Sequence, residues 1–193
     1  MTSISNQIQA AIIVGSLRKE SFNRMVAKSL IAVTPKSVIL EILEIGQLPM
    51  YNQDLDDSPP KEWTEFRQRL KNYDAVIFIT PEYNRSVPGV LKNAIDVGSR
   101  PYGQNAFNGK PGAVISVSVG ALGGFGANHH LRQSLVFLNV PTMPQPEAYI
   151  GEAAKLFEAN GSLNNKTSRD FLTKFMTTFV LWVEENKMQA VNQ

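Results

Sequence analysis

The sequence contains no cysteine. Disulfides, thiolate nucleophiles and cysteine-ligated zinc or iron–sulfur sites are therefore excluded. A strong excess of one charge is also missing, because 19 Lys and Arg side chains stand against 17 Asp and Glu side chains, for a net charge of +2. So small an excess gives no reason to expect a nucleic-acid partner or an acidic membrane surface.

Long apolar runs are missing as well. None approaches the ~18 residues needed to cross a bilayer. The opening MTSISNQIQ lacks a basic segment followed by an apolar one, so we expect no signal peptide. Together with the missing cysteines, this favours the cytoplasm. The ordinary composition, 43% hydrophobic and 19% charged over 193 residues, argues against disorder and predicts a single domain over 1–193.

Short, nearly continuous β-branched runs recur along the chain. Four are clear and the fifth is weaker: AAIIV at 10–14, VILEIL at 38–43, AVIFIT at 75–80, AVISVSV at 113–119 and EAYI at 147–150. Such runs are typical of parallel strands covered by helices on both faces. Helical patterns alternate with them, at 22–30, 61–73, 89–95, 126–138 and 170–187. The alternation predicts an α/β doubly wound sheet.

The loops that follow the strands are where such a sheet binds ligands. The first, GSLRKESFNR at 15–24, gathers hydroxyl, amide and guanidinium donors in Ser16, Ser21, Asn23 and Arg18, at the point where a helix begins. That set suits a phosphate monoester. The loop matches neither the dinucleotide fingerprint nor a Walker loop. By itself it is equally consistent with a capped helix and a solvated arginine.

The second loop begins at Pro81, which ends the strand ladder because it has no N–H to donate. We predict that the N–H groups of Glu82, Tyr83 and Asn84 point at a ligand. Tyr83 offers a flat apolar face, and Asn84 offers both a donor and an acceptor, as a planar heterocycle requires. Considered alone, this stretch is more typical of a surface turn with a capping asparagine.

The third loop, SVGALGGFGAN at 118–128, is rich in glycine. We expect Gly120, Gly123, Gly124 and Gly126 to allow a close approach of the backbone to a ligand, although a flexible connection would have the same composition. Three such loops, all placed after strands, favour one shared binding site more strongly than any of them does separately.

These motifs resemble the NADPH-dependent FMN reductases, in the branch that contains bacterial chromate and quinone reductases. The resemblance rests on GSLRKESFN at 15–23, LPMYNQDLD at 48–56, TPEYNRSVPGVLKNAIDVGSR at 80–100, GKP at 109–111 and GALGGFGANHHLRQSLVFLNV at 120–140. It implies a flavodoxin-like fold with a five-stranded parallel sheet of order 2-1-3-4-5, helices on both faces, and non-covalent FMN.

The resemblance also assigns roles by position. The FMN phosphate would be held by Ser16, Arg18, Ser21 and Asn23, with Leu17 and Phe22 supporting their loop. The isoalloxazine ring would be lined by Pro81, Glu82, Tyr83 and Asn84. The ring or the ribityl chain would also face Ser118 and Gly120.

The implied reaction is a hydride transfer from NADPH, or NADH, through FMN to a small-molecule acceptor. The acceptors would be quinones, free flavins, azo compounds or metal oxyanions such as chromate. Exchange at one shared site would give ping-pong kinetics, with no catalytic side chain and no metal. The family also implies a homodimer or homotetramer, with residues 84–102 and 124–138 near the contacts.

Two alternatives stay open. A flavodoxin-type electron carrier would bind FMN without NADPH activity, but such carriers have a strongly acidic surface that a net charge of +2 does not provide. A structural or sensory domain could keep the fold without flavin, which the retention of Arg18, Asn23 and Asn84 disfavours. His129 and His130 are helix neighbours that point in different directions, so we expect them at a surface or an interface rather than at a metal.

Overall fold

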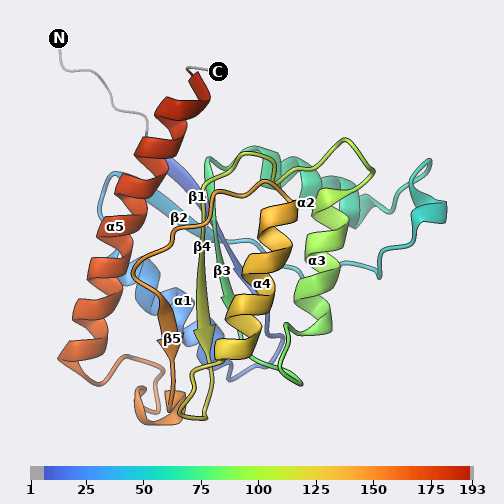
Figure 1. Ribbon diagram of the computed structural model, residues 1–193. Helices are drawn as coiled ribbons and strands as arrows, with labels where there is room; N and C mark the ends of the chain where they lie inside the picture. Colours follow the sequence, from blue (N-terminus) through green and yellow to red (C-terminus); the bar gives the residue numbers. More distant parts are fainter. Residues whose placement is uncertain (1–6, 192–193) are drawn as a thin grey trace.

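The computed structural model describes residues 7–191 (Figure 1). Its sheet has the strand order β2 (Val38–Ile42), β1 (Ile8–Val14), β3 (Ala75–Thr80), β4 (Gly112–Val117) and β5 (Ala148–Ile150). Every described pairing of neighbouring strands is parallel. The α/β class and the order 2-1-3-4-5 are therefore confirmed. The expected absence of a signal peptide concerns residues that lie outside the described part, and the single domain over 1–193 also stays a prediction.

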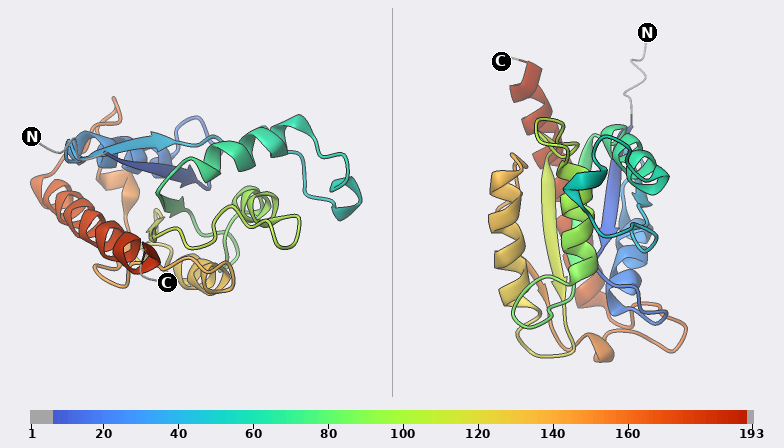
Figure 2. Two further views of the ribbon diagram at one scale, coloured as in Figure 1. Left: turned by 90° about the horizontal axis from the view of Figure 1, so that it is seen from above. Right: turned by 90° about the vertical axis from the view of Figure 1, so that its right-hand side faces the viewer.

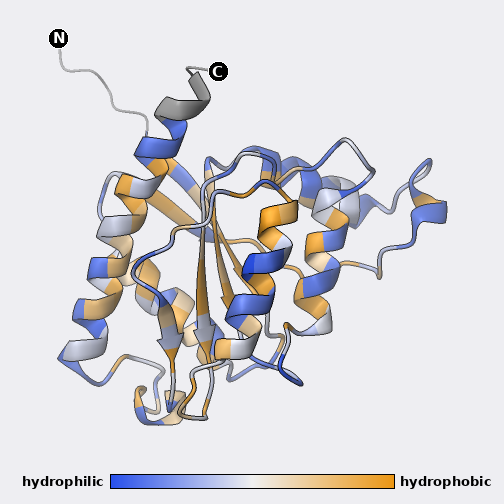
Figure 3. Cartoon of the chain, viewed as in Figure 1, coloured by the Kyte–Doolittle hydropathy of each residue, from blue (hydrophilic) through white to orange (hydrophobic). Residues whose placement is uncertain are grey.

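Helices cover both faces of the sheet (Figure 2). α1 (Phe22–Val33) and α5 (Lys166–Val191) pack on one face, and α2 (Lys61–Lys71), α3 (Gly89–Ser99) and α4 (Phe125–Phe137) pack on the other. Alternate residues of each strand point to opposite faces, so the sheet separates two apolar cores. The strands are accordingly apolar almost throughout (Figure 3). Within residues 7–191, no helix combines the length and apolar character needed to span a membrane.

The element boundaries follow local chemistry. Ser21 is the N-cap of α1, and its hydroxyl accepts a hydrogen bond from the N–H of Arg24 at 3.3 Å. Pro88 immediately precedes α3, as expected for a residue that has no N–H to satisfy. The fourth predicted strand ends two residues earlier than expected, because the chain turns at Ser118, whose hydroxyl accepts from the N–H of Gly120 at 3.1 Å.

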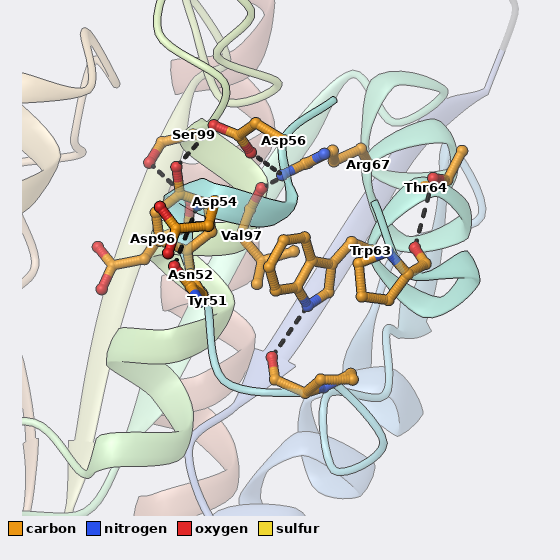
Figure 4. Close-up of polar contacts among 12 residues, drawn as sticks. Tyr51, Asn52, Asp54, Asp56, Trp63, Thr64, Arg67, Asp96, Val97 and Ser99 are labelled. Atoms are coloured by element: carbon orange, nitrogen blue, oxygen red, sulfur yellow. Dashed lines mark hydrogen bonds and ion pairs between the residues drawn. The ribbon is translucent and has the colours of Figure 1, made fainter. Parts of the chain in front are cut away.

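A half-buried ion pair holds the loop between β2 and α2 (Figure 4). Nη2 of Arg67 lies 3.8 Å from Oδ1 of Asp56, and the two side chains are 12% and 17% exposed. Nε of Arg67 donates to the carbonyl of Val97 at 2.8 Å, and the guanidinium lies 5.5 Å from the ring centroid of Trp63. The hydroxyl of Tyr51 donates to Oδ2 of Asp56 at 2.9 Å. One guanidinium thus joins this loop, α2 and the end of α3.

We predict that Arg67→Ala lowers the free energy of unfolding by about 2–4 kcal/mol, because it leaves the Asp56 carboxylate buried without a counter-charge. Arg69→Ala is the matched control on the same helix. The ion pair of Arg69 with Glu41 joins side chains that are 46% and 56% exposed. The free energy of unfolding of Arg69→Ala should therefore fall by less than about 1 kcal/mol. Urea unfolding followed by far-ultraviolet circular dichroism measures both. Equal losses in the two variants would contradict the prediction.

Candidate functional site

The first loop leaves β1 at Gly15. The N–H of Gly15 donates to the carbonyl of Ile79 in β3 at 2.8 Å. A Cβ at this position would lie 3.1 Å from the side chain of Leu91 and 3.4 Å from Pro81. The missing side chain therefore allows the loop after β1 to pack directly on the loop after β3.

Beyond Gly15, the loop presents polar groups at the start of α1. Ser16, Ser21 and Asn23 are buried, at 5%, 2% and 5% exposure. Oδ1 of Asn23 has no hydrogen-bond partner among the described residues. Arg18 is exposed, and no ion pair to it occurs within residues 7–191. A buried asparagine, whose amide NH2 group can donate, and an uncompensated cation thus lie beside a helix N-terminus, which itself favours an anion.

The second loop forms a tight hairpin. The N–H of Tyr83 donates to the carbonyl of Ser86 at 2.9 Å, and the reverse bond measures 3.0 Å. Asn84 and Arg85 between them both have positive φ, 52° and 62°, as a two-residue hairpin turn requires. The prediction that the Tyr83 N–H points at a ligand is therefore wrong, because the hairpin uses that group. The side chains of Tyr83 and Asn84 remain exposed, as their proposed contact with a ligand requires.

The carboxylate of Glu82 turns toward α4. Its Oε2 accepts from the N–H of Ala127 at 3.0 Å, and its Oε1 accepts from Nη1 of Arg85 at 2.8 Å. Each oxygen of the carboxylate thus already accepts a hydrogen bond from protein, one of them from the start of α4. Sequence reasoning missed this contact, because Glu82 and Ala127 lie 45 residues apart and no local motif joins them.

The glycines of the third loop serve protein packing. A Cβ on Gly123 would lie 2.6 Å from the backbone of Tyr149, one on Gly124 would lie 3.0 Å from Ser116, and one on Gly126 would lie 3.0 Å from Glu82. The space left by the missing side chains at these three positions is therefore taken up by protein, and the expectation that a ligand approaches their backbone stays a prediction. Gly120 differs, since its added Cβ would meet only the Ser118 hydroxyl, at 3.6 Å.

The three loops enclose a cleft of about 150 Å³ beyond the carboxyl ends of β1, β3 and β4. This is the switch point, where the strand order reverses between β1 and β3. The cleft is lined by Ser16, Arg18, Ser21, Phe22, Asn23, Pro81, Glu82, Tyr83, Val117, Ser118 and Val119. Of the predicted site residues, Leu17, Asn84 and Gly120 lie outside this lining and are exposed. The two valines were not predicted, because they read as the end of an apolar strand.

The size of the cleft limits what it can enclose. Ligand sites that bury a whole small molecule have volumes of about 300–1,000 Å³, and this cleft has only about 150 Å³. It can therefore surround one end of a nucleotide-sized ligand. The remainder would lie along the exposed side chains of the second and third loops.

A larger apolar cavity, about 410 Å³, lies beside β5 and the start of α5. Its wall includes Phe157, which stacks on Phe22 with ring centroids 6.1 Å apart, and Phe22 in turn lines the cleft. None of the predicted site residues lines this cavity. The smaller cleft is the better candidate site, because it carries convergent donors at the switch point.

The two histidines of α4 have separate partners. Nε2 of His129 lies 2.9 Å from the hydroxyl of Tyr149, and Nδ1 of His130 lies 2.7 Å from Oγ of Ser86. They thus point in different directions, as expected. The Tyr149 hydroxyl donates to Glu147 at 2.7 Å, and burial together with this carboxylate raises the pKa of Tyr149 to about 12. Tyr149 is therefore a neutral donor at ordinary pH.

A parallel sheet of this order, with donor-rich loops converging at its switch point, defines a flavodoxin-like nucleotide-binding protein. The chain belongs to the NADPH-dependent FMN reductase family, whose model matches residues 8–155.

Individual relatives extend the match over nearly the whole chain. A quinone reductase from Pseudomonas putida is 60% identical over 185 residues, which are 95% of this chain and 99% of that protein. A 2-hydroxy-1,4-benzoquinone reductase from Burkholderia sp. is 41% identical over 181 residues, which are 94% of this chain and 99% of that protein. The solved structure of FerB, a flavoenzyme NAD(P)H:(acceptor) oxidoreductase from Paracoccus denitrificans, has a TM-score of 0.87 at 42% identity and covers 93% of this chain and 98% of its own.

These comparisons confirm the resemblance drawn from the motifs. The chain is an oxidoreductase of a family that uses FMN and NAD(P)H and that includes quinone reductases. This membership favours the enzyme over the electron carrier and over a domain without flavin.

Proposed function

We propose that the cleft binds FMN and that the enzyme reduces quinones with NAD(P)H. The observation that carries the proposal is the convergence of Asn23, whose amide NH2 group is a donor, and an uncompensated cation, Arg18, at the N-terminus of α1. These groups suit a dianionic phosphate monoester, which accepts hydrogen bonds on every oxygen. The small volume of the cleft fits the phosphate end of the cofactor better than its ring.

The same proposal gives each loop a role. The phosphate is held by Ser16, Arg18, Ser21 and Asn23, and Leu17 and Phe22 support that loop. The isoalloxazine ring lies along Pro81, Glu82, Tyr83 and Asn84, with Ser118 and Gly120 facing the ring or the ribityl chain. The exposed faces of Tyr83 and Val119, 52% and 64% exposed, are then free to cover the ring and exclude water from it.

When bound, FMN supplies the redox chemistry, taking hydride from NAD(P)H and passing two electrons to an acceptor. The protein's residues bind and orient the reactants, and no side chain at the cleft is placed to move a proton. Glu82, the one carboxylate in the lining, is engaged by Ala127 and Arg85. Quinones are the acceptors that the relatives' names support. Free flavins, azo compounds and metal oxyanions such as chromate are further candidate acceptors. The exposed face of the bound isoalloxazine ring would be flat and open, and it would discriminate only weakly between acceptors of different shape.

The proposal includes ping-pong kinetics, in which NAD(P)H and the acceptor bind in turn at one shared site. NADPH should bleach the yellow protein under nitrogen, and a quinone added afterwards should restore the colour. Steady-state rates with both substrates varied should give parallel double-reciprocal lines. Intersecting lines would refute the shared site. A protein that is yellow but is not bleached by NADPH would be an electron carrier.

Arg18→Ala tests the phosphate site. We expect a loss of FMN affinity of about 1.5–3 kcal/mol, because the variant removes a charge-assisted hydrogen bond to phosphate. Lys19→Ala removes an equal charge from the neighbouring exposed position and should change the affinity by much less. Titration of apoprotein with FMN, followed by flavin fluorescence, measures both. Equal effects of the two variants would show that only net charge matters.

We also propose that the enzyme works as a homodimer or homotetramer. The support is the apolar surface of α4, where Val136 and Phe137 are 78% and 74% exposed, together with Tyr102 at 87%. These positions fall in or beside the expected contact regions 84–102 and 124–138. A fully active monomer in light scattering would overturn the proposal. The cytoplasmic location stays a prediction.

A further inference from the structure

The hairpin that carries Tyr83 needs support from outside itself. Asn84 and Arg85 both occupy the left-handed region, at φ 52° and 62°, which costs on the order of 1–2 kcal/mol for each residue other than glycine. Two backbone hydrogen bonds between Tyr83 and Ser86 close the turn. A two-residue turn of this kind is marginal on its own, so other contacts must hold it.

That support comes from α4. The helix begins after Gly124, which is left-handed and provides no side-chain cap. Glu82 supplies the missing cap from the hairpin, because its Oε2 accepts from the third N–H of the helix, that of Ala127. One turn along the same helix, His130 contacts Ser86 at the far end of the hairpin. The hairpin is thus tied to α4 at both ends.

The packing leaves no spare room at this junction. A Cβ on Gly126 would lie 3.0 Å from Oε2 of Glu82 and 3.2 Å from the carbonyl of Arg85. One added methyl group would therefore require the Glu82 carboxylate and the Arg85 carbonyl to shift by a few tenths of an ångström. In contrast, a Cβ on Gly89, in the first turn of α3, would meet nothing within 4 Å.

The junction also removes a negative charge from the cleft. The side chain of Glu82 is only 12% exposed, and its carboxylate lies between Arg85 and the N-terminus of α4. Both neighbours are positive, so the carboxylate is compensated locally. The cation of Arg18 on the facing loop then remains available for an anionic ligand.

We propose that the Glu82 carboxylate is a positioning residue for the flavin. By capping α4, it fixes the hairpin in its strained turn, so that Tyr83 and Asn84 are already ordered where the isoalloxazine ring binds. The binding of FMN then does not have to order the hairpin, an ordering that would otherwise lower the affinity. This inference rests on the proposed FMN site.

The test uses apoprotein of the full chain, titrated with FMN, and the visible circular dichroism of the bound flavin. Glu82→Ala should weaken FMN binding about tenfold, the effect of losing one capping hydrogen bond of roughly 1.4 kcal/mol. Glu82→Gln should lose less than about threefold, because its amide oxygen still accepts from the N–H of Ala127. Gly126→Ala should weaken binding by several-fold without altering any polar group, whereas Gly89→Ala should bind as the parent does.

The flavin spectrum separates positioning from general stability. The visible dichroism of bound FMN should change in Glu82→Ala and Gly126→Ala and should return to the parent form in Glu82→Gln. FMN binding within twofold of the parent in both damaged variants, with unchanged dichroism, would overturn the inference. The inference would also be overturned if Glu82→Gln bound FMN as weakly as Glu82→Ala, because the charge of Glu82 would then matter more than its hydrogen bond. If Glu82→Ala does not fold, the inference is tested by comparing the FMN affinity and flavin dichroism of Gly126→Ala with those of Gly89→Ala.

Arg18→Ala in the same titration distinguishes this inference from the proposed function. A loss in Arg18→Ala without a loss in the Glu82 and Gly126 variants overturns only the role of Glu82. No loss in any of them overturns the FMN site as well.

Discussion

The close contact at Gly15 is the constraint on which the candidate site depends. Parallel pairing brings the carboxyl ends of β1, β3 and β4 to one edge, and at Gly15 an added Cβ would lie only 3.1 Å from Leu91 and 3.4 Å from Pro81. A side chain there would require Leu91 or Pro81 to shift by a few tenths of an ångström. The missing Cβ thus lets the loop after β1 pack closely on Pro81 and on α3.

The distribution of charge around the cleft follows from that convergence. Glu82 and Arg18 lie in facing loops, yet each has a different environment. The carboxylate is compensated by a helix N-terminus and by Arg85, whereas the guanidinium has no ionic partner among the described residues. The fold therefore leaves the Arg18 cation uncompensated at the cleft of a protein whose overall charge is only +2, and this local arrangement, rather than the overall charge, suits the proposed phosphorylated cofactor.

Sequence reasoning recovered the sheet, because buried parallel strands are continuous apolar runs and their helices begin at Ser21 and Pro88. It also recovered most of the cleft lining, since loops that follow such strands share one edge. It did not foresee two contacts. The Tyr83 N–H bonds to Ser86, three residues on, in a turn whose Asn84-Arg85 pair is not the usual Asn-Gly signature. The packing of Gly123 against Tyr149 joins segments that are far apart in the sequence and has no local signature. A glycine-rich loop has the same composition whether it approaches a ligand or its own protein.

The two outer strands have a consequence for self-association. β5 has only three residues, and Pro146, just ahead of it, has no N–H to offer an incoming strand. β2 has five residues and carries the charged Glu41. Short edge strands that carry a charge or adjoin a proline disfavour the edge-to-edge pairing of sheets that leads to fibrils. The proposed association of copies is thereby favoured through helical surfaces rather than through the sheet edges.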